Sequence, residues 1–397
     1  MHILFICSEY PPLPHGGIGT FVHTLAHGLR EKGHRITVVG MDGKPGRSTD
    51  GGIEVFTLPK SAVPYVGNIL SRRSLRSWLQ RYVRREKVDI VETPDFLGML
   101  PFGLANCPVV VRLHLSSTSI YLQRGQKASK GIALYEELTL RMNPAWAAVS
   151  NYIYSSTCEV FGIRPDRFKI IYNPVPRMDA PSPASDELPS RFMLFAGQVS
   201  KRKGAVVLAE AARELMSAHA DLHLVYAGGA ISTDDPVPIT QRILDAVGPE
   251  FAGRVRFLGH VSHSRVLECM SAAAVYVFPS RLEAFGLVIL EAMYCGTPVV
   301  CTSYPPGPEI VTDGVDGLLA DPTSPSDLAK KISRILLEPA LAERLRGNGK
   351  RTIVERFSLA KCIAETESFY ADCLSGGARR PSFFAQALLS ARNLVRK

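Results

Sequence analysis

Two carboxylates eight residues apart stand at the start of a predicted helix in the second half of the chain. Glu283 lies in the loop after the apolar run 275–278, and Glu291 lies inside the apolar segment that begins near Phe285. Since a helix rises about 1.5 Å per residue, Glu291 is expected roughly 9 Å into the helix, where it is partly exposed. The amino end of this helix directs N–H donors at an anion, and carboxylates accept hydrogen bonds from sugar hydroxyls. The pattern predicts a nucleotide-sugar site.

A glycine-rich turn provides a second candidate site near the start of the chain. Gly16, Gly17 and Gly19 follow the apolar run 2–7 and precede apolar residues at helical spacing. Such a turn offers free backbone N–H groups and a helix amino end, both suited to an anion. The spacing is not the G-x-G-x-x-G of dinucleotide sites, and no acidic residue stands at the next strand end. An anion site and a tight turn without a ligand both remain open.

Short apolar runs alternate with amphipathic segments along the chain, which is typical of βα units around a parallel sheet. Strands are predicted in the first half at 2–7, 35–40, 88–92, 109–114 and 169–172, and in the second half at 192–196, 223–227, 255–258, 275–278 and 298–302. The proline-rich stretch 174–190 separates the two halves. The predicted fold class is α/β, with two Rossmann-like domains whose parallel sheets face each other across a cleft.

The length of 397 residues exceeds that of a single core and supports two domains. We place the first domain at 1–175, the linker at 176–190 and the second domain at 191–356. Residues 357–397 are expected to form a helix that crosses back to the first domain, followed by a basic tail.

Composition limits the compartment and the partners. The 46 Lys and Arg against 37 Asp and Glu give a net charge of +9, which favours anionic partners. The eight cysteines are scattered without a C-x-x-C pair, as in reduced cytoplasmic proteins. No apolar run reaches the roughly 18 residues that span a bilayer. We expect a cytoplasmic protein, or one peripheral at the inner face of the membrane, and no nucleic-acid partner, because few aromatic residues lie among the basic ones.

The segment 72–87 predicts an amphipathic basic helix. Its apolar residues Leu75, Trp78, Leu79, Tyr82 and Val83 share one face, and its arginines at 72, 73, 76, 84 and 85 lie mainly elsewhere. These arginines form either the solvated face of a packed helix or a contact with anionic lipid headgroups. The tail 379–397 has a similar stripe and could lie in the membrane interface in the same way.

Together these motifs resemble the retaining glycosyltransferases of family 4, which have the GT-B fold. The resemblance rests on the E-x7-E element, the GGIG loop, His114 at a strand end, Asn173–Val175, and Lys203 in GQVSKRKG. It extends from about residue 1 to 375. It implies transfer of a hexose from a nucleotide diphosphate sugar, with retention, to a saccharide, lipid-linked or small-molecule acceptor in polysaccharide or glycoconjugate biosynthesis.

The resemblance also implies roles for particular residues. Glu291 would bind the donor ribose, Glu283 would lie beside the transferred sugar, and Lys203 would neutralise the diphosphate. His114 would contact the sugar and position the acceptor, so that His114, Glu283 and Lys203 form the implied catalytic set. Gly16 and Gly17 would close over the phosphate. The remaining implied donor-binding residues are Gln198, Arg202, His260, Val261, Ala284, Phe285, Gly286 and Leu287.

Metal and cofactors other than the donor are not expected, because no D-x-D carboxylate cluster stands at a strand end. One position departs from the family: Gln198 replaces the usual arginine. A neutral amide cannot offset phosphate charge, so we expect Lys201 or Arg202 to compensate. Because of this departure, a second interpretation stays open, in which the protein binds nucleotide sugars or has a regulatory role but is not catalytic. An epimerase on the same fold fits the E-x7-E context less well.

Overall fold

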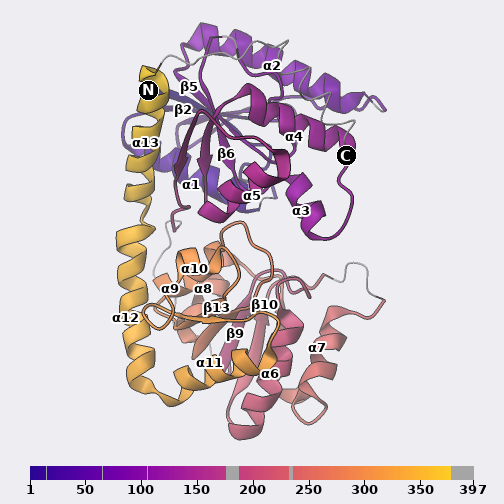
Figure 1. The fold of residues 1–397 in the computed structure, drawn as a ribbon, viewed down its shortest axis with the longest axis vertical. Coiled ribbons are helices and arrows are strands. Elements are labelled where there is room, and N and C mark those ends of the chain that lie inside the picture. Colours follow the sequence, from indigo (N-terminus) through magenta and orange to yellow (C-terminus); the bar gives the residue numbers. More distant parts are fainter. Residues whose placement is uncertain (15, 65, 105, 176–186, 232–235, 377–397) are drawn as a thin grey trace. The chain divides into compact units, whose positions relative to one another are not determined.

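The computed structural model describes residues 1–14, 16–64, 66–104, 106–175, 187–231 and 236–376 (Figure 1). The chain forms two compact units, one of Met1–Pro176 with Leu359–Lys397 and one of Arg177–Ser358. These bounds lie within two residues of the expected 175 and 357. Most of the expected linker, at 176–186, and the basic tail from 377 onward lie outside the described residues.

The first unit is built on an eight-stranded sheet with the order β3-β4-β2-β1-β5-β6-β7-β8. All neighbours are parallel except β3, which pairs antiparallel with β4. Its strands are β1 His2–Ile6, β2 Arg35–Gly40, β3 Gly46–Asp50, β4 Ile53–Thr57, β5 Ile90–Pro94, β6 Val109–Leu113, β7 Ala145–Ala148 and β8 Arg167–Ile170. Its helices are α1 Gly17–Glu31, α2 Gly67–Glu86, α3 Ser117–Gln123, α4 Lys130–Met142, α5 Asn151–Phe161 and α13 Leu359–Ser375.

The second unit has a six-stranded parallel sheet with the order β11-β10-β9-β12-β13-β14. Its strands are β9 Phe192–Ala196, β10 His223–Ala227, β11 Val255–Gly259, β12 Val275–Phe278, β13 Val299–Thr302 and β14 Leu318–Ala320. Its helices are α6 Ala205–Ala218, α7 Ile239–Val247, η1 Ala252–Arg254, α8 His263–Ala272, α9 Leu287–Tyr294, α10 Gly307–Ile310, α11 Pro325–Leu337 and α12 Pro339–Arg356. In chain order the strands read 3-2-1-4-5-6, the doubly wound Rossmann order.

The α/β prediction is confirmed, and the predicted strands at 35–40, 192–196, 223–227 and 275–278 have the observed bounds. The first-unit strand predicted at 88–92 begins two residues later, at Ile90. Four observed strands were not predicted: β3, β4, β7 and β14. Three of these carry little signal, because β3 (GRSTD) has no apolar residue, β7 has four residues and β14 has three.

Helix α13 completes the core of the first unit. Its residues Ile363, Phe369 and Tyr370 share a buried cluster with Leu25 and Leu29 of α1. Helix α13 is the yellow helix beside that unit in Figure 1. The last described helix is therefore a structural part of the unit that contains the start of the chain.

The basic face predicted on α2 is wrong for two of its arginines. Arg72 is buried, donates to the carbonyl oxygens of Gly98 at 2.8 Å and Leu97, and lies 4.2 Å from the ring centroid of Tyr135. Arg76 donates to a carbonyl of the same loop. These guanidinium groups satisfy backbone carbonyls that would otherwise be buried without donors. The other arginines of α2 are exposed: Arg73, Arg81, Arg84 and Arg85.

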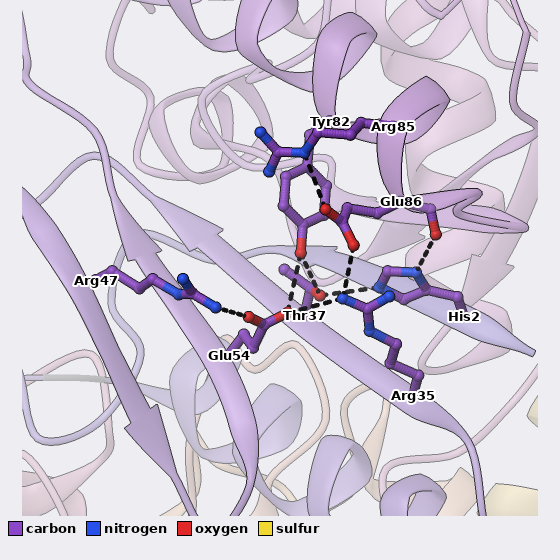
Figure 2. A network of polar contacts seen from close by, with 8 residues as sticks. All are labelled: His2, Arg35, Thr37, Arg47, Glu54, Tyr82, Arg85 and Glu86. Atoms are coloured by element: carbon purple, nitrogen blue, oxygen red, sulfur yellow. Dashed lines mark hydrogen bonds and ion pairs between the residues drawn. The ribbon is translucent and has the colours of Figure 1, made fainter.

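A polar network joins α2 to the amino ends of β1 and β2 (Figure 2). Arg35 pairs with Glu86 at 2.8 Å and with Glu54 at 3.2 Å, and His2 Nε2 lies 2.9 Å from Thr37 Oγ1. Burial lowers the pKa of His2, so its imidazole is held neutral. Ligands of parallel α/β sheets bind at the carboxyl ends of strands. This network lies at the opposite ends, so we assign it to stability.

No helix in the described part of the chain combines the length and apolar character needed to cross a lipid bilayer. The eight cysteines carry free thiols, six of them buried.

Candidate functional site

The second unit brings two predicted site residues together at the point where its strand order reverses. The loop after β9 carries Lys203, and the loop after the neighbouring β12 carries Glu283. The Lys203 ammonium forms an ion pair with the Glu283 carboxylate, and both side chains are 15% exposed. The ammonium also lies 5.5 Å from the ring centroid of Phe278. A cation and a carboxylate therefore meet at the usual ligand position of a doubly wound sheet.

A glycine makes this meeting sterically feasible. Gly204 has a φ of +79°, and a Cβ there would lie 2.1 Å from the carbonyl oxygen of Pro279. The backbone N–H of Arg281 also donates to the carbonyl of Arg202 at 3.1 Å. Because the two loops are in backbone contact, a larger residue at 204 would push Lys203 away from Glu283.

Gln198, which departs from the family pattern, lies next to the guanidinium group of Arg202. Gln198 is exposed, and its side-chain oxygen accepts a hydrogen bond from Arg202 Nη2 at 3.4 Å. The other terminal nitrogen of Arg202 donates to the carbonyl of Leu282 at 3.3 Å, whereas Lys201 is exposed. The guanidinium of Arg202 thus lies next to the end of the Gln198 side chain, between the two loops.

Helix α9 begins at Leu287, two residues after the expected start. Its N-cap Gly286 has a φ of 96°, and the preceding Phe285 is buried with its ring centroid 5.9 Å from that of Phe357. Within the described ranges, the backbone N–H groups of Leu287 and Val288 donate no hydrogen bond. The half-buried Ala284 completes the loop. These amides leave the amino end of α9 with donors for an anion.

Glu291 is more buried than the partial exposure expected for it. Its side chain is 9% exposed, and its carboxylate lies 3.1 Å from Nε2 of His263, the first residue of α8. The hydrogen bond that His263 donates to the Glu291 carboxylate raises the pKa of His263. The sequence analysis did not identify His263, although it follows the exposed His260 and the half-buried Val261 by two to three residues. Proximity to that loop was the signal that could have found it.

In the first unit, a carboxylate occupies the helix amino end expected to face a phosphate. Glu9 Oε1 accepts a hydrogen bond from the backbone N–H of Gly19 at 2.8 Å, in the first turn of α1. A Cβ on Gly16 would lie 3.7 Å from this carboxylate, and one on Gly17 would meet nothing within 4 Å. An anion approaching this turn therefore meets the charge of Glu9.

His114 directly follows β6, and Asp95 directly follows the neighbouring β5. The backbone N–H of His114 donates to Asp95 Oδ1 at 2.9 Å, and its ring packs edge-on against Phe21 with centroids 5.0 Å apart. Burial, with the nearby charge of Arg112, lowers the pKa of His114 to about 3. Neither imidazole nitrogen has a hydrogen-bond partner among the residues that the structure describes. His114 is therefore a neutral group with free hydrogen-bonding capacity.

Asp95 and Asn173 also carry buried oxygens without partners. Burial raises the pKa of Asp95 to about 7, and its Oδ2 has no hydrogen-bond partner in the described part of the chain. Asn173 lies in the segment after β8, and its Oδ1 also has no hydrogen-bond partner among the described residues. Buried polar atoms in proteins are normally hydrogen-bonded, so these oxygens mark places where a ligand or water would be satisfied.

A buried ion pair holds β6, the strand that directly precedes His114. Arg112 donates to both carboxylate oxygens of Glu92, at 3.1 and 2.9 Å, and both side chains are at most 2% exposed. Tyr370 of α13 donates to the same carboxylate at 2.6 Å. Bidentate geometry fixes both side chains. The C-terminal helix thus helps to position β6 and His114.

Comparisons with known proteins agree with this architecture. Two family models match the chain, "Glycosyltransferase Family 4" over residues 15–177 and "Glycosyl transferases group 1" over residues 183–352. The chain is 27% identical over 392 residues to an uncharacterised glycosyltransferase of Methanocaldococcus jannaschii, covering 93% of this chain and 98% of that protein. It is 26% identical over 398 residues to a glycogen synthase of Mycobacterium tuberculosis, covering 93% and 94%.

Solved structures share the fold. Sucrose-phosphate synthase from Thermosynechococcus elongatus superposes with a TM-score of 0.76 at 21% identity, over 95% of this chain and all of that chain. HepE of Anabaena, in complex with UDP-glucose, has a TM-score of 0.66 at 18% identity, over 94% and 100%. The predicted GT-B fold is thus confirmed, and the two family models, which together match most of the chain, identify it as a glycosyltransferase of the family 4 type.

Proposed function

We propose that this glycosyltransferase uses the second unit to bind a nucleotide diphosphate sugar and transfers its hexose with retention. The observation that carries the proposal is the Lys203–Glu283 ion pair beside the unoccupied N–H donors of α9, at the strand-order reversal of the sheet. A cation and a helix amino end stabilise a diphosphate, and a carboxylate accepts hydrogen bonds from a sugar.

Each group in this unit has a proposed part in donor binding. Lys203 and the amides of Phe285, Gly286 and Leu287 hold the phosphates, and Arg202 supplies the charge that Gln198 lacks. Glu283 accepts from the sugar hydroxyls. The ribose binds Glu291, where it displaces or joins His263, and the base lies by His260 and Val261. The complex of HepE with UDP-glucose supports a uridine donor, which makes UDP-glucose the first compound to assay.

The transfer step is proposed to depend on stabilisation of the leaving group. As the bond between the anomeric carbon and the phosphate oxygen breaks, negative charge grows on the diphosphate, and fixed cations and helix amides stabilise it. The acceptor oxygen attacks from the same face and gives its proton to the departing phosphate, so no protein nucleophile is needed. Neutral His114 serves as a hydrogen-bonding group toward the sugar and acceptor, because its lowered pKa disfavours an acid role.

The glycine turn keeps a proposed role over the donor phosphate, at Gly16 and Gly17. Because Glu9 already accepts a hydrogen bond from the backbone N–H of Gly19, this role requires the carboxylate to move aside when phosphate approaches. The pattern of side chains offers no carboxylate cluster of the D-x-D type, so we propose transfer that does not require a metal at the reacting phosphates. Full initial rates in excess EDTA are expected, and a strict requirement for Mg²⁺ would overturn this part.

The alternative function is a nucleotide-sugar-binding or regulatory protein without turnover. Release of nucleoside diphosphate from UDP-, ADP- and GDP-sugars, with saccharide and lipid-linked acceptors, separates the two. We expect release with at least one donor. Tight binding of a donor with no release under any condition would favour the regulatory role.

An anionic membrane is the second proposed partner, and the start of α2 provides the observation for it. Val63, Val66, Ile69 and Leu70 are 40–50% exposed, beside the exposed Arg73. Apolar side chains enter the interface while nearby cations attract anionic headgroups. The wild-type protein is expected to float together with phosphatidylglycerol vesicles, and an Ile69→Ser/Leu70→Ser variant is expected to remain in the lower fraction without vesicles. If the wild type binds neither anionic nor neutral vesicles, the exposed arginines of α2 form only a solvated face of a packed helix.

A further inference from the structure

A cluster of two histidines and one aspartate lies in the first unit, outside the groups assigned above. His23 and His27 are four residues apart on α1, so their side chains lie on one face of the helix. Asp50 ends the edge strand β3. Its Oδ2 lies 3.3 Å from His23 Nε2 and 2.9 Å from His27 Nε2, and the three ligand atoms all lie within 4.8 Å of one another. From these observations we propose that His23, His27 and Asp50 bind a divalent transition-metal ion. We use Zn²⁺ as the representative ion in the argument and in the test.

The separations between the ligand atoms approach those around such an ion. Zinc takes imidazole nitrogens and carboxylate oxygens at about 2.0–2.2 Å in a tetrahedral arrangement, which places neighbouring ligand atoms roughly 3.3–3.5 Å apart. Both histidines present Nε2 to the same carboxylate oxygen: His23 at 3.3 Å, which matches that value, and His27 at 2.9 Å, which is shorter and must lengthen when an ion binds. Three protein ligands with a water in the fourth position complete a common zinc coordination. Imidazole ligands favour late transition metals over Mg²⁺.

The surroundings hold the ligands in place. The Tyr10 hydroxyl donates to Asp50 Oδ2 at 2.8 Å, and Tyr10 is buried. Gly51 has a φ of +51°, and a Cβ there would lie 2.8 Å from His27 Cε1, so the turn after β3 leaves room for this ring. Hydrogen bonds to a ligating carboxylate orient it and tune metal affinity. The ligands are only partly buried, with 30–40% of their side chains exposed, so an ion can reach them.

The ion would add a further anchor for β3, beyond its pairing with β4. The strand GRSTD has no apolar residue, and its first four residues are exposed. A metal bound by Asp50 and the α1 histidines ties this edge to the helix. Through Tyr10 it also ties the loop that leads to Gly16. The proposed role is structural, and it is independent of how the sugar is transferred.

The cluster has a competing explanation as histidine–aspartate ion pairs without metal. In that arrangement burial opposes ionisation of Asp50, but the hydrogen bonds from His27 and Tyr10 outweigh it and lower the Asp50 pKa. Ion pairs need protonated histidines and strengthen as pH falls, whereas metal binding needs neutral histidines and weakens as pH falls. Ion pairs alone therefore predict no stabilisation by Zn²⁺ at any pH, whereas the metal site predicts a stabilisation by Zn²⁺ that weakens as pH falls.

The test uses the untagged full chain, stripped with EDTA and dialysed. Zn²⁺ titration against a chromophoric chelator at pH 7.5 is expected to give one tight equivalent, and thermal melting is expected to rise with Zn²⁺ but not with Mg²⁺. In the His23→Gln/His27→Gln variant, affinity is expected to fall by more than about a hundredfold, because outer-shell groups alone contribute about 10- to 100-fold. Tyr10→Phe is expected to lose roughly tenfold.

A matched control is His34→Gln, which removes a histidine paired with a carboxylate, Glu367, at 2.6 Å. Among the described residues, His34 belongs to no group of three potential metal ligands. It is expected to bind Zn²⁺ like the wild type. Circular dichroism of each metal-free variant checks that it folds. The proposal is overturned if the wild type binds no equivalent of Zn²⁺ with a Kd below about ten micromolar. It is also overturned if the double variant and the wild type bind Zn²⁺ with equal affinity.

Discussion

Replacing Glu283 with Gln is expected to tighten the binding of a nucleoside diphosphate while lowering sugar transfer. In the structure the Glu283 carboxylate holds the Lys203 ammonium, which we assign to the diphosphate. Glutamine has nearly the same shape and can still hydrogen-bond a sugar hydroxyl, but it carries no charge. The substitution therefore frees Lys203 for phosphate and removes a negative charge beside it.

The size of the effect follows from the burial of the pair. A hydrogen bond to a charged group contributes about 1.5–3 kcal/mol net. Both side chains are 15% exposed, so solvent screens the pair less than a surface ion pair. Lysine has three N–H donors and can keep part of its bond to Glu283 when phosphate binds. If roughly 1 kcal/mol opposes the diphosphate, its loss tightens Kd about threefold to tenfold.

Isothermal titration of UDP, ADP and GDP against four proteins tests this reasoning: wild type, Glu283→Gln, Lys203→Met and the double variant. The nucleotide that binds the wild type is expected to bind Glu283→Gln more tightly and Lys203→Met at least tenfold more weakly. The double variant is expected to show no gain over Lys203→Met. Unchanged or weaker binding to Glu283→Gln would refute a competition between Glu283 and phosphate for Lys203.

Four further predictions concern Arg202 and three buried residues of the first unit, His114, Asp95 and Glu92. Arg202→Ala is expected to lower kcat/KM about threefold to tenfold with the fold intact, and full activity would remove it from the donor site. Below pH 6.5 the unfolded state binds a proton at His114 that the folded state refuses, so the stability advantage of wild type over His114→Ala should shrink by up to about 1.4 kcal/mol per pH unit as pH falls toward 4. Asp95 has the opposite sign, since its raised pKa destabilises the wild type relative to Asp95→Asn as pH rises from 4 to 7; urea unfolding across pH measures both. Glu92→Gln should cost about 3–5 kcal/mol of unfolding free energy by leaving a buried guanidinium uncompensated, against about 1 kcal/mol for Tyr370→Phe, and equal costs would contradict the buried ion pair.

The sequence could predict the relative placement of candidate residues that lie close together in the chain. The loop and helix around Glu283 and Glu291 are contiguous, and the strand before them is a clear apolar run, so their relative placement follows from helix geometry. The pairing of Lys203 with Glu283 could not be read in the same way. The two residues are 80 positions apart, and their meeting depends on β9 and β12 being neighbours in the sheet.

Other groups escaped prediction because their partners come from weakly marked segments. His23 and His27 show helical spacing, but Asp50 belongs to an exposed strand with no apolar residue, so nothing in the sequence placed it beside them. Arg72 was expected on a solvated face, but its burial depends on the carbonyls of a loop 25–26 residues away. Glu9 carries no signal for capping α1, since the turn between them has no regular period.

Binding of nucleotide sugars to wild type, Glu291→Ala and Glu343→Ala tests the central claim, that the strand-order reversal of the second unit is the donor site. Glu343 lies exposed on α12 and serves as a control of the same residue type. By isothermal titration, at least one of UDP-, ADP- or GDP-glucose is expected to bind the wild type and Glu343→Ala with equal affinity. The same donor is expected to bind Glu291→Ala at least about tenfold more weakly, because a buried hydrogen bond to a charged group is lost. Equal binding to all three proteins would contradict the claim.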